Sequence, residues 1–276
     1  MKRITTIALL SLIQFNIEAQ DIGVQLYSFR NEFAKDVPGT LKRISNMGIT
    51  KLEGGSTYGI SVAEFKELLD KNHLKVISIG ADFDRLENDI YSVIGDAKSY
   101  GAKYVMCAWI PHKGDEFTIE NAKHAVDVFN KAGKLLREKG LTLCYHAHGY
   151  EFRPYESGTL FDYMATHMNP AYANFEMDVF WIKHPGQDPV ALLQKYSGRF
   201  ILMHLKDRKP GTPGNQNGNA DVESNVVLGQ GDVGIAEIMK IAKKSGVKQF
   251  FIEDESSRSF EQVPLSLEYL KALKKK

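Results

Sequence analysis

The chain is poor in cysteine, with only Cys107 and Cys144 among its 276 residues. Both lie inside short apolar runs, where cysteine behaves as a small buried hydrophobic side chain. Two such residues do not form the disulfide framework that holds together small secreted domains. The fold must therefore rest on a hydrophobic core, and a hydrophobic content of 43% is sufficient for one.

The chain also lacks an excess of either charge. Its 35 lysines and arginines balance 34 acidic residues, which leaves a formal net charge of +1. Nucleic-acid-binding domains are usually strongly basic, so this balance excludes a general nucleic-acid binder. The partner we expect is a small molecule. The oligomeric state is left open, and a homo-oligomer is compatible with the sequence.

Long apolar runs are absent beyond the N-terminus, so no stable membrane insertion is expected. The chain opens with Met1-Lys-Arg, continues with a mostly apolar stretch up to Ile17, and then reads Glu18-Ala19-Gln20. This order is typical of a secretory signal peptide; the alternative is an N-terminal helix of the mature fold. We predict a signal peptide at residues 1–20, cleavage near Ala19 or Gln20, and a periplasmic or secreted protein consisting of residues 21–276.

The rest of the chain alternates between short apolar runs and amphipathic segments. Buried parallel strands have this appearance, and the expected strands are 22–27, 49–53, 74–79, 103–109, 141–145, 172–177, 200–204 and 249–253. Helices are expected at 37–47, 61–72, 119–139, 160–167, 189–196, 235–244 and 265–273, with a further helical stretch ending near residues 100–101.

Eight strand–helix units predict a closed (β/α)8 TIM barrel forming a single domain. The alternative is an open, doubly wound sheet, which normally carries a glycine-rich phosphate-binding turn after its first strand. The stretch Gln25-Leu-Tyr-Ser-Phe-Arg30 has no glycine there, and the barrel is preferred.

One segment interrupts the alternation. Residues 208–220 are rich in glycine, proline and asparagine, and they begin a loop that extends to residue 227 after the seventh strand. Such a loop is either a lid over the mouth of the barrel or a tolerated surface insertion.

Polar side chains gather at the ends of the last four expected strands. Active sites of TIM barrels lie at these carboxyl ends. The residues concerned are His146, His148 and Glu151, then Glu176 and Asp178, then His204, Lys206 and Asp207, and finally Glu253, Asp254 and Glu255. Imidazoles and carboxylates without a thiolate suit Mn²⁺, Fe²⁺, Co²⁺ or Zn²⁺ better than Ca²⁺ or Mg²⁺.

Five motifs carry a resemblance to a known family: residues 23–30 (GVQLYSFR), 145–152 (YHAHGYEF), 203–207 (MHLKD), 228–232 (LGQGD) and 252–254 (IED). Together they make the chain similar to the xylose isomerase-like TIM-barrel superfamily. That group includes sugar isomerases and epimerases, inosose dehydratases, dehydroshikimate dehydratases and endonuclease IV. Endonuclease IV needs more histidines for its three metals than this chain offers, so it is set aside.

The resemblance implies a divalent metal ion held by His146, Asp178, His204 and Glu253. His148 matches a position where dehydratases of the group place a histidine for proton transfer. Two positions depart from the sugar epimerases: His146 stands where they usually have a glutamate base, and Trp181 stands where several relatives have a histidine. Both departures weigh against a symmetric epimerisation by two carboxylates.

The chemistry implied is removal of a proton next to a carbonyl, with an enediolate stabilised by the metal. His148 is the first candidate for the base, followed by Glu151 and Glu253, and Glu151 could also be a ligand. Lys206 could neutralise the enediolate or form a salt bridge with Asp207. Residues that could bind the sugar are Glu53 and His112 and, by stacking, Tyr27, Trp109 and Trp181.

Three functions remain open. The first is a metal-dependent isomerase or epimerase of sugars or keto sugars. The second is a metal-dependent lyase or dehydratase acting on a keto sugar, keto-glycoside or inosose. The third is a carbohydrate-binding barrel without catalytic activity. An exported protein without a glycine-rich phosphate nest is a poor match for sugar phosphates.

Overall fold

The structure is a computed structural model that describes residues 22–273. The predicted signal peptide, 1–20, and its cleavage site lie outside the described residues.

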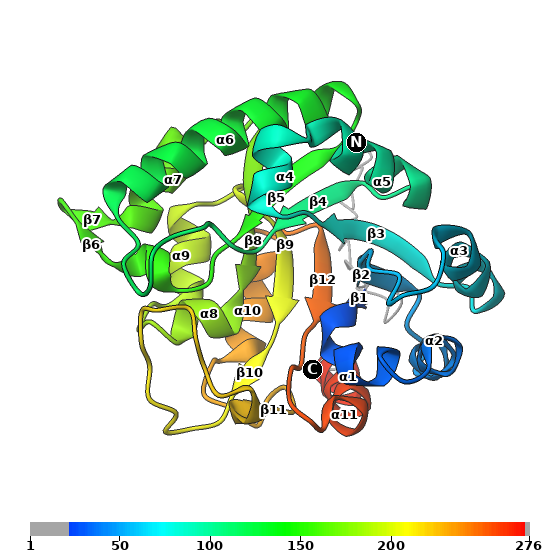
Figure 1. Ribbon diagram of the computed structural model, residues 1–276. Coiled ribbons are helices and arrows are strands. Elements are labelled where there is room, and N and C mark those ends of the chain that lie inside the picture. Colours follow the sequence, from blue (N-terminus) through cyan, green and yellow to red (C-terminus); the bar gives the residue numbers. More distant parts are fainter. Residues whose placement is uncertain (1–21, 274–276) are drawn as a thin grey trace, which may run out of the picture.

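Eight parallel strands close into a barrel, as predicted (Figure 1). Around the barrel they follow the order β1-β2-β3-β4-β5-β8-β9-β12, and β12 pairs with β1. Their bounds are β1 Ile22–Gln25, β2 Lys51–Gly54, β3 Lys75–Gly80, β4 Tyr104–Cys107, β5 Thr142–His146, β8 Ala173–Asp178, β9 Phe200–Leu205 and β12 Gln249–Ile252. Each coincides closely with an expected strand, because a parallel strand that is buried on both faces has a short, nearly continuous apolar sequence bounded by turns.

Helices form an outer layer around these strands (Figure 1). They are α1 Arg30–Phe33, α2 Val37–Asn46, α3 Val62–Lys71, α4 Phe83–Asn88, α5 Ile90–Tyr100, α6 Ile119–Glu138, α7 Leu160–His167, α8 Val179–Lys183, α9 Pro189–Lys195, α10 Ile235–Ala242 and α11 Ser259–Leu273. Local sequence explains where several begin. The Ser61 side chain caps α3 by accepting from the backbone N–H of Glu64, and Thr118 forms a capping box with Asn121 at the start of α6.

The core lies between the strands and the inner faces of the helices. Val24, Val105 and Leu143 are fully buried members of one continuous hydrophobic cluster. Cys107 and Cys144 are free thiols and completely buried, which confirms that they act as small apolar side chains.

Two of the boundaries that differ from expectation have a local explanation. The first strand stops at Gln25 because the Gln25 side chain accepts from the backbone N–H of Tyr27 and starts a 3-10 turn, Leu26–Phe29. The last helix begins at Ser259, six residues earlier than expected, and contains Pro264. A proline five residues into a helix removes one backbone hydrogen bond, and the turn before it still forms.

The loop after β9 is ordered by contacts at both ends. It begins and ends in a two-stranded antiparallel ladder, β10 Asp207–Arg208 with β11 Asn225–Val226. The Arg208 guanidinium binds both carboxylate oxygens of Asp232, at 2.9 and 2.8 Å. We call the segment between the two strands, residues 209–224, the strap.

No helix within residues 22–273 combines the length and the apolar character that crossing a bilayer requires.

Candidate active site

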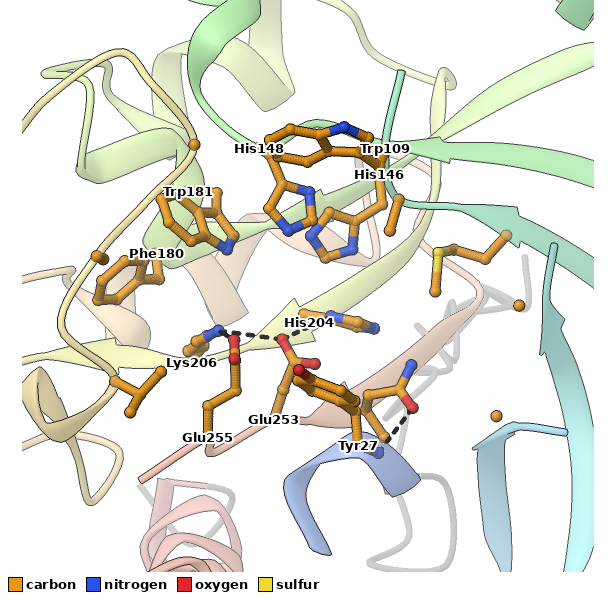
Figure 2. A pocket seen from close by; sticks show the side chains of 18 of the residues that line it. Tyr27, Trp109, His146, His148, Phe180, Trp181, His204, Lys206, Glu253 and Glu255 are labelled. Carbon is orange, nitrogen blue, oxygen red and sulfur yellow. Dashed lines mark hydrogen bonds and ion pairs between the residues drawn. The ribbon is translucent and has the colours of Figure 1, made fainter. Parts of the chain in front are cut away.

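The carboxyl ends of the barrel strands surround a cavity of about 690 Å³. Side chains from opposite sides of the barrel point into it (Figure 2). Eight sequence-predicted site residues line this cavity: Tyr27, Trp109, His146, His148, Trp181, His204, Lys206 and Glu253. The barrel topology thus places the active-site candidates where TIM barrels keep their chemistry.

Three donor atoms from successive strands converge at the base of the cavity. The Nε2 atom of His146 lies 3.8 Å from Oδ2 of Asp178, and Nδ1 of His204 lies 3.9 Å from the same oxygen. These distances are too long for hydrogen bonds, and none of the three buried atoms has a hydrogen-bond partner among residues 22–273. Buried polar atoms are rarely left without partners. A divalent metal ion fits this arrangement, which spans less than 4.8 Å between donor atoms.

Glu253, the fourth expected ligand, borders the same group. Its Oε2 atom lies 3.3 Å from Nδ1 of His204 and 3.2 Å from Nζ of Lys206. Oε2 of Glu253 therefore lies between the predicted metal site and Lys206, the only lysine among the described residues that line the cavity.

Two buried carboxylates support the histidines from behind. Oε2 of Glu176 lies 3.2 Å from Nδ1 of His146 and 3.3 Å from Nε2 of His204. Oε1 of Glu53 lies 2.5 Å from Nε2 of His204 and accepts from the side chain of Gln25. Each histidine thus uses one ring nitrogen for a carboxylate and turns the other toward the predicted metal site. This is the usual support of a metal-binding histidine.

The sequence pattern indicates no role for Glu176 and places Glu53 among the residues that could bind the sugar. The structure buries Glu53 completely, outside the cavity lining. A signal for Glu176 existed, because it precedes Asp178 by two residues on the same strand and therefore shares its face.

His148 follows the end of β5 and lies against His146, the first expected ligand. Its ring stacks on that of His146 at a centroid distance of 4.6 Å, and its Nδ1 atom has no partner in the described chain. Burial, reinforced by the positive charge of Lys206, lowers the pKa of His148 to about 4. The imidazole is therefore neutral near pH 7 and able to accept a proton.

Lys206 is buried but forms no pair with Asp207. Its ammonium group pairs with the carboxylates of Glu253 and Glu255. Burial alone would lower the pKa of Lys206, but these two carboxylates raise it above the usual value, so the side chain stays charged. Asp207 instead accepts four backbone N–H groups, including those of Gly229 and Gly231, and so holds the loop after β11.

Glu151 and His112 lie outside the cavity lining. The Glu151 carboxylate is fully buried, accepts the Tyr145 hydroxyl and receives the backbone N–H groups of His148 and Gly149. Burial outweighs these hydrogen bonds and raises the pKa of Glu151 to about 7. Its contacts hold the turn that carries His148. His112 stacks on Trp109 at 5.0 Å.

The aromatic side chains of the cavity differ in what they expose. Tyr27 is 52% exposed and Trp109 42% exposed, so their rings are open to a ligand. Trp181 is only 6% exposed. The strap closes over this region, with Gly218, Asn219, Ala220 and Val222 among the lining residues. Its residues thus border the cavity, which is the position that the lid alternative requires.

The profile of the xylose isomerase-like TIM barrels matches residues 41–275. The chain belongs to this family.

Among curated relatives of this xylose isomerase-like barrel, an inosose dehydratase from Geobacillus kaustophilus is 25% identical over 216 residues. The match covers 67% of this chain and 68% of the relative. A solved sugar phosphate isomerase/epimerase from Parabacteroides distasonis superposes with a TM-score of 0.77 at 25% identity, covering 91% of this chain and 98% of the other. The relatives thus carry names from two reaction classes.

Two more distant barrels were solved with metals. The IOLI protein, with a bound zinc atom, has a TM-score of 0.69 at 14% identity, covering 92% of this chain and 96% of the other. A xylose isomerase-like barrel from Mycobacterium smegmatis, in complex with magnesium, has a TM-score of 0.70 at 14% identity and the same coverage. Likeness at this identity shows a shared fold.

The strap of this xylose isomerase-like barrel rests on Trp109 at Gly218, which gives a testable contact. Gly218 has a φ of +77°, and a Cβ there would lie 2.9 Å from Tyr150 and 3.0 Å from Trp109. Gly218→Ala is expected to lift the strap and to speed its cleavage by proteinase K about tenfold, since overpacking against the two rings costs roughly 1–3 kcal/mol. Gly211→Ala is the matched control, since Gly211 has a φ of +82° but open space around its Cβ. Equal cleavage rates of the two variants would show that the contact between Gly218 and Trp109 does not hold the strap in place.

Proposed function

We propose that this protein is a metal-dependent enzyme that removes a proton next to a carbonyl of a neutral keto sugar, keto-glycoside or inosose and then eliminates a β-oxygen. The proposal rests on one observation above all: three unpartnered donor atoms of His146, Asp178 and His204 converge beside the neutral, unliganded imidazole of His148.

Bound divalent metal would act as a Lewis acid, stabilising the negative charge that develops on the substrate oxygens. The buried carboxylates of Glu176 and Glu53 keep His146 and His204 in the orientation that ligation requires.

His148 is the residue we assign to the proton. Its imidazole is directed into the cavity (Figure 2), and the buried carboxylate of Glu151 holds its backbone N–H. A general base must come within about 3 Å of the proton it takes. A base held beside the metal ligands is within reach of the carbon next to a carbonyl that those ligands help to bind.

Elimination is favoured because one side of the cavity offers a free base and the other does not. The carboxylates facing His148, those of Glu253 and Glu255, are both engaged by Lys206. A β-elimination needs only one acid–base group, because the proton that His148 takes can be passed to the leaving oxygen, which departs as water or an alcohol. Epimerisation needs acid–base groups on both faces of the substrate. The inosose dehydratases among the relatives support this choice.

Isomerisation or epimerisation is the second candidate. Glu253 and Glu255 lie across the cavity from His148 (Figure 2), and a carboxylate there could return the proton to the opposite face. The name of the Parabacteroides neighbour supports this reading.

NMR in D₂O separates the two reactions. With D-fructose, a 3-keto-glucoside and an inosose as trial substrates, an unsaturated product would indicate elimination. Deuterium incorporation without loss of an oxygen would indicate isomerisation or epimerisation. Metal analysis comes first, because a wild-type protein that binds no stoichiometric metal would overturn both enzyme proposals and leave the carbohydrate-binding barrel.

Charge in the cavity favours a neutral substrate over a sugar phosphate. Among the described residues that line it, three carboxylates, Asp82, Glu253 and Glu255, face a single lysine and no arginine. Lys206 is already neutralised by two of them. A phosphate group would therefore meet no free cation in the wall.

We expect the metal-loaded protein to prefer a neutral ketose over its phosphate ester by roughly tenfold or more in kcat/KM, since like charges brought together cost several kcal/mol. Glu255→Gln should leave Glu253 as the one carboxylate partner of the Lys206 ammonium and tighten binding of inorganic phosphate severalfold, measured by calorimetry. Glu237→Gln breaks a similar pair on the surface, with Lys240 at 2.6 Å, and serves as the control. A wild-type protein that prefers the phosphate ester would contradict the charge argument.

We also propose that the protein is exported and meets its neutral keto sugar outside the cytoplasm, because residues 1–20 have the layout of a signal peptide. Sequencing the N-terminus of the mature protein from the producing cells tests this.

A further inference from the structure

The indole N–H of Trp181 is a hydrogen-bond donor in the cavity wall to which no role has been assigned. Its indole Nε1 atom is buried and has no hydrogen-bond partner in the described part of the chain, although the residue lines the cavity. A buried N–H without a partner is costly, by about 1–3 kcal/mol, and is a reason to look for a ligand that satisfies it.

The position of this indole is fixed relative to the metal ligands. Trp181 lies in the first turn of α8, and its backbone N–H donates to Oδ1 of Asp178 at 3.1 Å. Oδ2 of the same carboxylate is the unpartnered atom of the metal site. A single side chain therefore ties the indole to the reacting centre.

Three neighbouring side chains crowd the indole ring. The Lys206 ammonium lies over the ring at 5.7 Å from its centroid, and the His148 ring lies at 5.2 Å. The His184 ring lies at 5.4 Å, nearly perpendicular to the indole. Figure 2 shows the indole nitrogen directed toward the space between His148, His204 and Lys206. Stacking of a sugar on Trp181 is thereby disfavoured, and the N–H edge is what the ligand meets.

We propose that Trp181 is a substrate-binding donor, and that its Nε1–H binds a hydroxyl, keto or ether oxygen of the sugar beside the carbon that His148 deprotonates. Indole nitrogen only donates and does not titrate. The bond thus selects an oxygen acceptor at that position and cannot take the proton from His148. This inference rests on the proposed function.

The first test observes the N–H directly in the full protein. The chain has two tryptophans, so ¹⁵N-labelled, zinc-loaded protein gives two indole signals, and Trp109→Phe identifies that of Trp181. Titration with D-fructose, a 3-keto-glucoside and an inosose is expected to move the Trp181 signal downfield in a saturable manner for the sugar that is turned over.

The second test removes the donor and keeps a ring. Trp181→Phe should retain metal content and thermal stability close to wild type and lose roughly tenfold in kcat/KM, the contribution of one hydrogen bond. A deoxy analogue that lacks the bonded oxygen should be turned over equally by both proteins, because the contact is then missing in each.

The outcomes separate the two claims. If the sugar binds and is turned over while the Trp181 signal stays in place, or if Trp181→Phe is as active as wild type, the donor role is refuted and the proposed function stands. If no sugar binds to the metal-loaded wild-type protein, both the proposed function and the donor role of Trp181 are refuted.

Discussion

His146→Ala is expected to lose its metal and, with it, nearly all activity. The substitution removes one of three converging donor atoms and leaves the Glu176 carboxylate without its partner on that side. Loss of a supporting residue alone typically costs 10- to 100-fold in metal affinity, so loss of a ligand should exceed roughly 100-fold. Activity should fall on the order of 10³-fold or more, because several kcal/mol of charge stabilisation disappear.

Elemental analysis and a competition titration with a metal chelator measure this effect. His124→Ala is the matched control, since His124 is an exposed histidine that pairs with Glu87 and does not line the cavity. Glu176→Gln should give an intermediate loss of affinity, within about 10- to 100-fold. Full metal content in His146→Ala would mean that the ion is held elsewhere.

His148→Ala is expected to keep its metal and lose turnover. The ring of His148 stacks on His146 but contributes no atom to the donor cluster, so affinity for the ion should change little. General acid–base catalysis typically contributes 10²- to 10⁴-fold, and the loss in kcat should lie in that range.

Two measurements separate proton transfer from packing in this variant. Deuterium exchange into the substrate should slow together with turnover, and added imidazole should restore part of it by filling the space of the missing ring. A metal-loaded His148→Ala protein with wild-type kcat would refute the assignment of this residue. If added imidazole raises the thermal stability of the variant but does not restore deuterium exchange, His148 has a structural role.

Much of the candidate site was readable from the sequence because it lies at strand ends. The apolar run of residues 141–145 predicts a strand, and the barrel fold then requires that His146 and His148 face its mouth. The same reasoning places His204 and Glu253 in the cavity wall and Asp178 beside His146. Resemblance to the family added the division of labour between these residues, which spacing alone could not supply.

The sequence does not reveal roles that depend on a partner from another strand. Glu53 and His204 are 151 residues apart, yet they share a hydrogen bond of 2.5 Å because the closed barrel turns side chains of β2 and β9 into the same interior. Glu53 thus holds His204, an expected ligand, where the sequence suggested contact with the sugar. Lys206 lies next to Asp207 in the chain but pairs with two glutamates that follow β12.

The sequence by itself determined the eight strand–helix units, the closed barrel and the strand ends that carry the chemistry. These follow from periodicity and burial, which each segment records locally. Only the tertiary structure decided which carboxylates face the metal site and which stand behind the histidines, that Lys206 is neutralised, and that the strap rests on Trp109. Those outcomes depend on the register between neighbouring strands, including its shift between Phe175 and Glu176 at the β8–β9 pairing. Register arises when the barrel closes, and no single segment encodes it.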